Sequence, residues 1–357
     1  METTYIQMFS AENTQFIPGI LLWGIEVIKV IQRLKSPALT AVLLFVTRLG
    51  TDMFYLPVIL FIFWWIDGKK GFRLGILMLL SAWINTILKS TFKQPRPFSF
   101  DPSLGLAYEG SYGAPSGHAQ YSFCFWVPIA AWLAGGKPGR RRARERAVVW
   151  AAAIFFVLLI GFTRLYLGVH FPTDLLAGWG VGAIILFLMY GLSLLFDKHF
   201  FNKHLIDQTR SQNILAALAA LIMISIYPGD RTIPAIFLGF CIGYNIMKNK
   251  FPFCGQSEIK EKKLFVMLSR CVTGLAGLVV IYFVLKLLLP GEESLFSYIP
   301  FWSQSSPFYE LGRFIRYGLL GLWASAGAPM FFQRMGLSFV TKTENSATAN
   351  RPKDDEA

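Results

Sequence analysis

Long apolar runs alternate with short polar stretches along most of the chain. A helix needs about 20 apolar residues to cross the hydrocarbon core of a bilayer. The pattern predicts transmembrane helices at roughly 52–66, 71–88, 118–135, 147–163, 174–196, 213–227, 232–247, 264–289 and 311–332. It therefore predicts an all-α integral membrane protein, a helical bundle of about nine transmembrane helices.

Two shorter apolar stretches precede these runs. Residues 16–33 carry Glu26 and Lys29 three positions apart, and residues 37–49 end near Arg48. Charges within short apolar stretches are typical of amphipathic helices that lie in the membrane interface. We predict two N-terminal interfacial helices, with a tilted span as the alternative for one of them.

The same pattern divides the chain into four predicted segments. These are an N-terminal interfacial segment, a transmembrane core, extra C-terminal transmembrane helices and a disordered polar tail, at 1–50, 51–197, 198–333 and 334–357. Residues 1–16 lack a basic segment followed by an apolar core, so we predict no cleaved signal peptide. The four cysteines show no paired spacing, which argues against a disulfide framework or a zinc site.

Composition supports a membrane protein and changes how the charge is interpreted. Of 357 residues, 54% are hydrophobic, and the mean hydropathy is +0.48. The net charge of +13 would suggest a nucleic-acid partner in a soluble protein. Here the basic residues lie between apolar runs, so we expect membrane-facing loops and no nucleic acid.

Lysine and arginine are distributed unequally between alternate loops. One set contains 3, 6, 3 and 5 basic residues, at 67–73, 136–146, 197–210 and 248–263. The other contains 3, 1, 1 and 0, at 89–117, 164–173, 228–232 and 291–310. The positive-inside rule makes the first set cytoplasmic. Most positive charge on the opposite face belongs to Lys89, Lys93, Arg96 and Arg164.

Three polar stretches open on that opposite face, all at predicted helix ends. They read KSTFKQPRP, APSGHAQ and TRLYLGVHFPTD. Their candidate functional residues are Lys89, Arg96, Ser116, Gly117, His118, Arg164, His170 and Asp174. Taken singly, most have ordinary explanations, such as a snorkelling lysine or a helix N-cap. Their coincidence on one face favours a functional site where the helix ends converge.

The residue types in these stretches suit a phosphate. Arginine forks and a lysine point charge match phosphate oxygens, which assigns Lys89, Arg96 and Arg164 to an anion site. Ser116 adds a hydroxyl, and the backbone at Gly117 adds N–H groups of a helix N-terminus. Without a carboxylate cluster, we expect no metal and no cofactor.

The histidines suggest chemistry on the bound anion. His170 and Asp174 are four residues apart near a helix start, so the carboxylate can fix the tautomer of the imidazole and make it more nucleophilic. His118 comes from another predicted span and is placed to act as a general acid. Two histidines beside an anion site predict phosphoryl transfer through a phosphohistidine.

Together the motifs resemble those of the type 2 phosphatidic acid phosphatase superfamily. K-x6-R-P runs from Lys89, P-S-G-H from Pro115 and T-R-x5-H-x3-D from Thr163, in the family's order. The resemblance covers roughly residues 38–196 and is greatest to bacterial members. Thr163 stands where the family more often has serine.

The resemblance implies a role for each candidate residue. His170 would attack phosphorus, Asp174 would orient it and His118 would protonate the leaving oxygen. The phosphoryl group would be bound by Lys89, Arg96, Ser116, Gly117 and Arg164. It further implies a metal-independent membrane phosphatase that takes a lipid phosphate from the bilayer, at the periplasmic face of a bacterial inner membrane.

The substrate and two rival functions stay open at this point. Candidate substrates are phosphatidic acid, a sphingoid phosphate, phosphatidylglycerophosphate and a polyprenyl diphosphate. The rivals are a lipid phosphotransferase with the same pocket and a non-catalytic lipid or anion transporter, which the extra spans at 198–333 would suit. A GxxxG pattern at Gly178 and Gly182 predicts close helix packing, with homo-oligomerisation as the alternative.

Overall fold

The computed structural model describes residues 19–135, 143–199, 208–250, 263–290, 295–296, 298–299, 306 and 308–337. Within these ranges the regular structure is helical and there are no strands. Most of the basic loop predicted at 136–146, and all of the predicted tail beyond residue 337, lie outside the described residues.

The chain forms two compact units, made of residues 1–59 with 73–205 and of residues 60–72 with 206–357. The helices up to residue 199 are α2 (Gly19–Gln32), α3 (Pro37–Thr47), α4 (Asp52–Phe61), α5 (Gly68–Phe92), α6 (Pro97–Phe100), α7 (Gly117–Ala134), α8 (Ala143–Tyr166) and α9 (Pro172–His199). Beyond them lie α10 (Gln208–Ile226), α11 (Thr232–Lys250), α12 (Lys263–Leu288), α13 (Tyr309–Leu322) and α14 (Ala328–Arg334). Short 3₁₀ turns lie at η2 (Arg48–Gly50) and η4 (Pro102–Leu104), and π-helical turns at η3 (Ile62–Ile66) and η6 (Trp323–Gly327).

The predicted all-α membrane fold is confirmed, whereas the count of nine spans is not. Five helical stretches among the described residues are long and apolar enough to cross a membrane, at 68–100, 143–166, 172–191, 209–226 and 264–288. The pair α2 and α3 would be a sixth if it is one broken span. The helices at 52–66 and 232–248 are apolar but shorter than a membrane span requires. An apolar run in the sequence therefore does not by itself predict the length of a helix.

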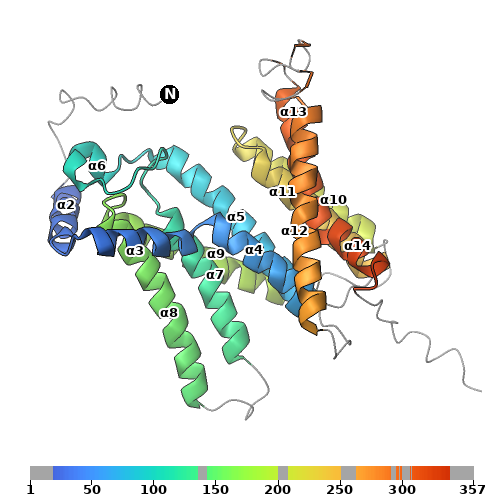
Figure 1. Cartoon of the computed structure of the whole chain (residues 1–357), viewed down its shortest axis with the longest axis horizontal. Helices are drawn as coiled ribbons and strands as arrows, with labels where there is room; N and C mark the ends of the chain where they lie inside the picture. The colour runs from blue at the N-terminus through green and yellow to red at the C-terminus, as the bar shows by residue number, and fades with distance from the viewer. Residues whose placement is uncertain are drawn as a thin grey trace, which may run out of the picture. The chain divides into compact units, whose positions relative to one another are not determined.

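The two N-terminal helices meet at a sharp bend of 119° (Figure 1). The bend has a local cause at the start of α3. The hydroxyl of Ser36 accepts the N–H of Leu39 at 3.2 Å, and Pro37 occupies the first turn. A side-chain cap followed by proline is typical of a new helix start, so α2 does not continue into α3.

In the first unit, α7 lies against both α8 and α9 (Figure 1). The predicted close packing at the GxxxG pattern is confirmed. A Cβ atom added at Gly178 would collide with the carbonyl oxygen of Ser116, and one at Gly182 would lie 3.3 Å from that of Gln120. These glycines let α9 approach the start of α7, where the P-S-G-H motif lies.

A buried polar network ties α5 to the start of α7. Gln120 donates to the hydroxyl of Ser81 at 2.9 Å and accepts from the amide of Asn85 at 2.9 Å. Asn85 also donates to the carbonyl of Pro115 at 3.3 Å. Because buried amides are costly to leave unpaired, this network fixes the P-S-G-H turn against α5.

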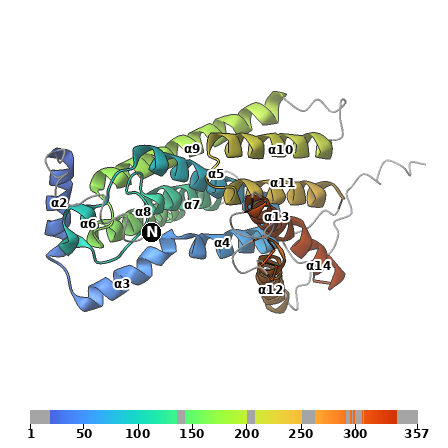
Figure 2. The ribbon, with the colours of Figure 1, turned by 90° about the horizontal axis from the view of Figure 1, so that it is seen from above.

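The second unit is built around close contacts between α11 and α13, with α10 beside α11 (Figure 2). Gly239 and Gly321 lie at this interface, where an added Cβ would collide with the facing backbone. Buried Arg270 on α12 donates to the carbonyls of Trp64 and Leu337 at 3.0 and 2.6 Å. Trp64 in turn donates to the carbonyl of Ala324 at 2.8 Å, so the two π-helical turns are bonded to each other.

Candidate active site

His170 lies in the short connection between α8 and α9, and the sequence fixes that connection firmly. Gly168 adopts a left-handed backbone with φ of 67°, which glycine takes without strain. The amide of Gln32 donates to the carbonyls of Leu104 and Tyr166, both at 2.8 Å. Helix α2 thereby holds the turn that precedes the histidine.

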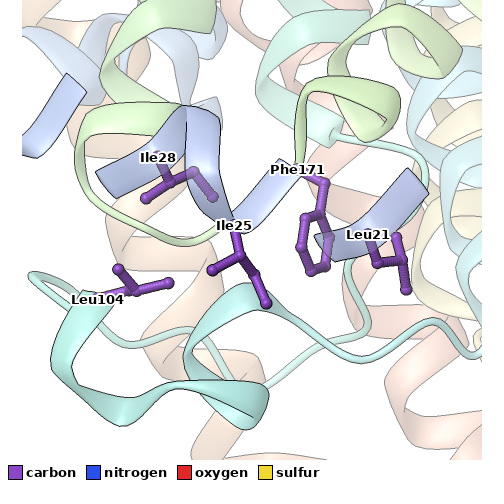
Figure 3. Packing of buried hydrophobic residues seen from close by; sticks show 5 residues of the cluster. All are labelled: Leu21, Ile25, Ile28, Leu104 and Phe171. Atoms are coloured by element: carbon purple, nitrogen blue, oxygen red, sulfur yellow. The ribbon is translucent and has the colours of Figure 1, made fainter. Parts of the chain in front are cut away.

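Apolar packing fixes the other side of the same connection (Figure 3). Phe171 is fully buried and joins a cluster with Leu21, Ile25, Ile28 and Leu104. Three of these residues belong to α2, so the first described helix covers the histidine's neighbour. Burying a phenylalanine side chain contributes on the order of 2 kcal/mol, enough to hold the backbone of the turn in one place.

His170 and Asp174 meet across the first turn of α9. The Nδ1 atom of His170 lies 3.2 Å from the Oδ2 atom of Asp174, and both residues are almost wholly buried. Nε2 of the same ring lies 3.2 Å from Nη1 of Arg96. Since a guanidinium only donates hydrogen bonds, Nε2 is the accepting nitrogen and Nδ1 carries the proton.

The carboxylate of Asp174 has two further donors. The N–H of Phe171 donates to Oδ2 at 2.9 Å, and the amide of Gln94 donates to Oδ1 at 2.6 Å. Gln94 is not among the residues predicted from the sequence, because it is an unspecified position within the K-x6-R-P motif. No pattern of the sequence indicates that it reaches α9. With three donors, the carboxylate is fixed in orientation and can in turn orient His170.

Arg96 connects the histidine to the outer loop. Its Nη1 donates to the carbonyl of Val169 at 2.8 Å, and its Nε donates to the carbonyl of Ser111 at 2.6 Å. Lys89 reaches the same loop, with Nζ at 2.5 Å from the carbonyl of Tyr112. The structure therefore brings two of the predicted phosphate ligands together around residues 111–112.

Arg164 joins them through a carboxylate that the sequence analysis also missed. Glu109 pairs with Nη2 of Arg96 at 2.8 Å through one oxygen and with Nη2 of Arg164 through the other. Arg164 also donates to the hydroxyl of Thr47 at 2.7 Å. The pairing depends on how the loop at residues 93–116 folds back, which residue spacing does not reveal.

The P-S-G-H residues occupy the start of α7. The N–H of Ser116 donates to the backbone carbonyl of Asp174 at 2.9 Å, while its hydroxyl caps the helix by accepting from Ala119 at 3.5 Å. A Cβ atom added at Gly117 would lie 3.2 Å from the amide oxygen of Asn85. This brings α5 and the third motif to the same helix start.

His118 and Thr163 are placed differently from the other motif residues. The ring of His118 lies against Gly50 and makes no hydrogen bond to another described residue. The hydroxyl of Thr163 donates to the carbonyl of Ile160 at 2.7 Å, within its own helix. Threonine in place of serine therefore keeps its hydroxyl bonded to α8.

The surroundings of His170 favour its neutral form. Burial is the largest cause, and the positive charges of Arg96 and Arg164 add to it, so that the pKa of His170 lies well below its ordinary value of 6.5. A neutral imidazole is a nucleophile through its unprotonated Nε2 once Arg96 no longer donates to that atom, whereas an imidazolium is not. The arrangement can therefore hold an anion beside a ready nitrogen nucleophile.

Comparisons with known proteins show what the chain is similar to. Residues 70–198 match the family model of the PAP2 superfamily. Residues 232–342 match a second family model, described as PAP2 superfamily phosphatase, transmembrane extension. The two matches together cover the three polar motifs and most of the second compact unit.

Individual relatives are similar over about half of the chain. Phosphatidylglycerophosphatase B of Bacillus subtilis (strain 168) is 33% identical over 162 residues, 44% of this chain and 77% of the relative. Undecaprenyl-diphosphatase of Sulfolobus acidocaldarius is 28% identical over 196 residues, 52% of this chain and 82% of the relative. The crystal structure of a transmembrane PAP2 type phosphatidylglycerolphosphate phosphatase from Bacillus subtilis is 26% identical, with a TM-score of 0.45 over 56% of this chain and 96% of that one.

Proposed function

The chain belongs to the PAP2 superfamily, and from this we propose that it hydrolyses the phosphomonoester or diphosphate of a membrane lipid. The observation that carries the proposal is the hydrogen bonding of the two ring nitrogens of His170. Its Nδ1 atom is bonded to Asp174 and its Nε2 atom accepts from Arg96. This leaves Nε2 as the nucleophilic nitrogen, at the side of the ring where the cationic residues gather.

The proposed reaction has two steps. Nε2 of His170 attacks phosphorus, the bond from phosphorus to the lipid oxygen breaks, and His118 gives its proton to that oxygen. Water then attacks the phosphohistidine, loses a proton to His118 and releases inorganic phosphate. Lys89, Arg96 and Arg164 stabilise the charge on the phosphoryl oxygens, assisted by the backbone N–H groups at Ser116 and Gly117.

We place the reaction at the extracytoplasmic face of the membrane and without a metal. The charge distribution of the loops supports the first point. The cationic phosphate ligands support the second, because they supply the charge that a metal ion provides in other phosphatases. The lipid tail stays in the bilayer while the phosphate reaches the arginines.

The test is phosphate release by the purified, detergent-solubilised protein in EDTA. The panel contains phosphatidic acid, a sphingoid phosphate, phosphatidylglycerophosphate and a polyprenyl diphosphate, and the ranking names the substrate class. We expect release from at least one member, with all lost substrate recovered as inorganic phosphate. No release from any lipid would overturn the proposal, and phosphate recovered on an added acceptor would indicate a transferase.

The pH profile of kcat/KM is expected to be bell-shaped. His170 must be neutral to attack, and its lowered pKa keeps it neutral at pH values below 6.5, so the acidic limb lies on the acid side of that value. His118 must be protonated to donate, and burial lowers its pKa to about 4, so its deprotonation places the basic limb on the acid side of neutrality. Initial rates in a constant-ionic-strength buffer series measure both limbs. A flat profile between about pH 5 and 9, the window around an ordinary histidine, would contradict two titrating histidines.

A further inference from the structure

The phosphate ligands of the proposed phosphatase are already bound to an anion of the protein itself. One carboxylate oxygen of Glu109 lies 2.8 Å from Nη2 of Arg96, and the other contacts Nη2 of Arg164. Both arginines are 2% exposed, whereas the side chain of Glu109 is 28% exposed. A half-buried carboxylate thus spans two guanidinium groups that are otherwise enclosed.

This arrangement copies the way a phosphoryl group would bind. Guanidinium groups bind carboxylate and phosphate oxygens with the same N–H donors and similar geometry. An N–H group that donates to Glu109 is not free to donate to a phosphoryl oxygen. Glu109 and a bound phosphate therefore compete for the inward donors of Arg96 and Arg164.

Unlike Asp174, the other carboxylate of the site, the side chain of Glu109 can move away from its partners. Asp174 is fully buried and accepts from three donors, so it is fixed. Glu109 lies on an irregular stretch between η4 and α7, beside Gly110, whose Cα faces open space. The same stretch lines a cavity of about 760 Å³, which also borders Arg96. The side chain has room to move without displacing a helix.

We propose that Glu109 is an internal competitor of phosphate, which occupies the arginines of the empty site and is displaced into the adjoining cavity by the phosphoryl group. The proposal rests on the proposed function for its choice of ligand. A phosphate dianion carries more charge and more acceptor oxygens than a carboxylate, so it wins the exchange. The exchange lowers the apparent affinity for every phosphate by one common factor, the fraction of molecules with free arginines. Weak binding of the product follows from it.

The test compares Glu109→Gln with the wild-type chain. Glutamine keeps the size of the side chain and removes its charge. The dissociation constant for inorganic phosphate, measured by titration calorimetry in EDTA, is expected to fall about tenfold, the effect of a competitor that occupies about nine-tenths of the molecules. KM for the lipid substrate is expected to fall by a similar factor with kcat unchanged, because the competitor occupies only the free enzyme and is already displaced in the substrate complex and the transition state. Glu145→Gln, the same change at an exposed residue of α8, is the control and is expected to match wild type.

A second variant separates occupation of the arginines from a long-range charge effect. Glu109→Asp keeps the charge but shortens the side chain by one methylene, about 1.5 Å, so it cannot span both arginines. Inorganic phosphate is expected to bind this variant more tightly than wild type. A wild-type dissociation constant for inorganic phosphate in Glu109→Asp would overturn the proposal. Weaker phosphate binding and a higher KM in Glu109→Gln would also overturn it, because they would show that Glu109 positions the arginines.

The binding measurement also separates this proposal from the proposed function. Titration with inorganic phosphate needs no turnover. Tighter phosphate binding by Glu109→Gln in a protein that releases no phosphate from any lipid would support the displacement and overturn the phosphatase. Phosphate binding by Glu109→Gln equal to that of wild type, in a protein that does release phosphate, would overturn the displacement and support the phosphatase. Unfolding temperatures of the variants in detergent show whether either comparison is made on folded protein.

Discussion

Replacing His170 by alanine is expected to abolish phosphate release, lowering kcat/KM by roughly 10⁴-fold or more. The variant lacks the Nε2 atom that attacks phosphorus, and among the described residues no other imidazole ring has one nitrogen bonded to Asp174 and the other to Arg96. A factor of 10⁴ corresponds to about 5.4 kcal/mol of transition-state stabilisation. The measurement is phosphate release in EDTA from the best substrate of the lipid panel.

The His170→Ala variant should still bind inorganic phosphate. Lys89 and Arg96 keep their bonds to the loop at residues 111–112, and Arg164 keeps its bond to Thr47. Retained binding with lost turnover would therefore assign the loss to chemistry rather than to folding. Near-normal turnover by a folded variant would contradict the phosphohistidine mechanism. Lipid movement across vesicles that survives the substitution would favour the transporter that the extra spans left open.

The local part of this site could be predicted from the sequence, because it depends on short spacings. A separation of four residues at a helix start places Asp174 beside His170 whatever the rest of the fold does. Apolar length likewise predicted helices over each of the nine ranges. The sequence also predicted the close packing at Gly178, because a small residue in an apolar helix is characteristic of such contacts.

What the sequence could not show depends on the path of the outer loop. Glu109 and Gln94 reach Arg164 and Asp174 only because residues 93–116 fold back over the ends of α8 and α9. Neither residue stands at a position whose spacing implies a partner. The hydrogen bond between the π-helical turns η3 and η6 was equally hidden, because it joins Trp64 to Ala324, 260 residues further along the chain.

Replacing Asp174 by asparagine is expected to lower kcat by roughly 10²–10⁴-fold while leaving KM within a few-fold of wild type. Asparagine has the shape of aspartate, and its oxygen can still accept from His170 and Phe171. Its NH₂ group would face Gln94, whose amide can turn to present oxygen. The hydrogen bonds are thus conserved and the negative charge is lost. That charge matters in the transition state, when the imidazole ring becomes positive as Nε2 bonds to phosphorus.

The comparison with a matched carboxylate isolates this effect. Asp101→Asn makes the same chemical change in the outer loop, where the side chain pairs with Lys29 at 3.7 Å and accepts from Ser103. It is expected to stay within about twofold of wild type, because asparagine can still accept from Ser103 and a partly exposed ion pair contributes little. Steady-state kinetics give kcat and KM for both variants, and inorganic phosphate binding tests the anion site. A wild-type kcat in Asp174→Asn would show that the negative charge of Asp174 is not needed for catalysis. Loss of phosphate binding would instead show that Asp174 holds the P-S-G-H turn, to which its backbone carbonyl is bonded through the N–H of Ser116.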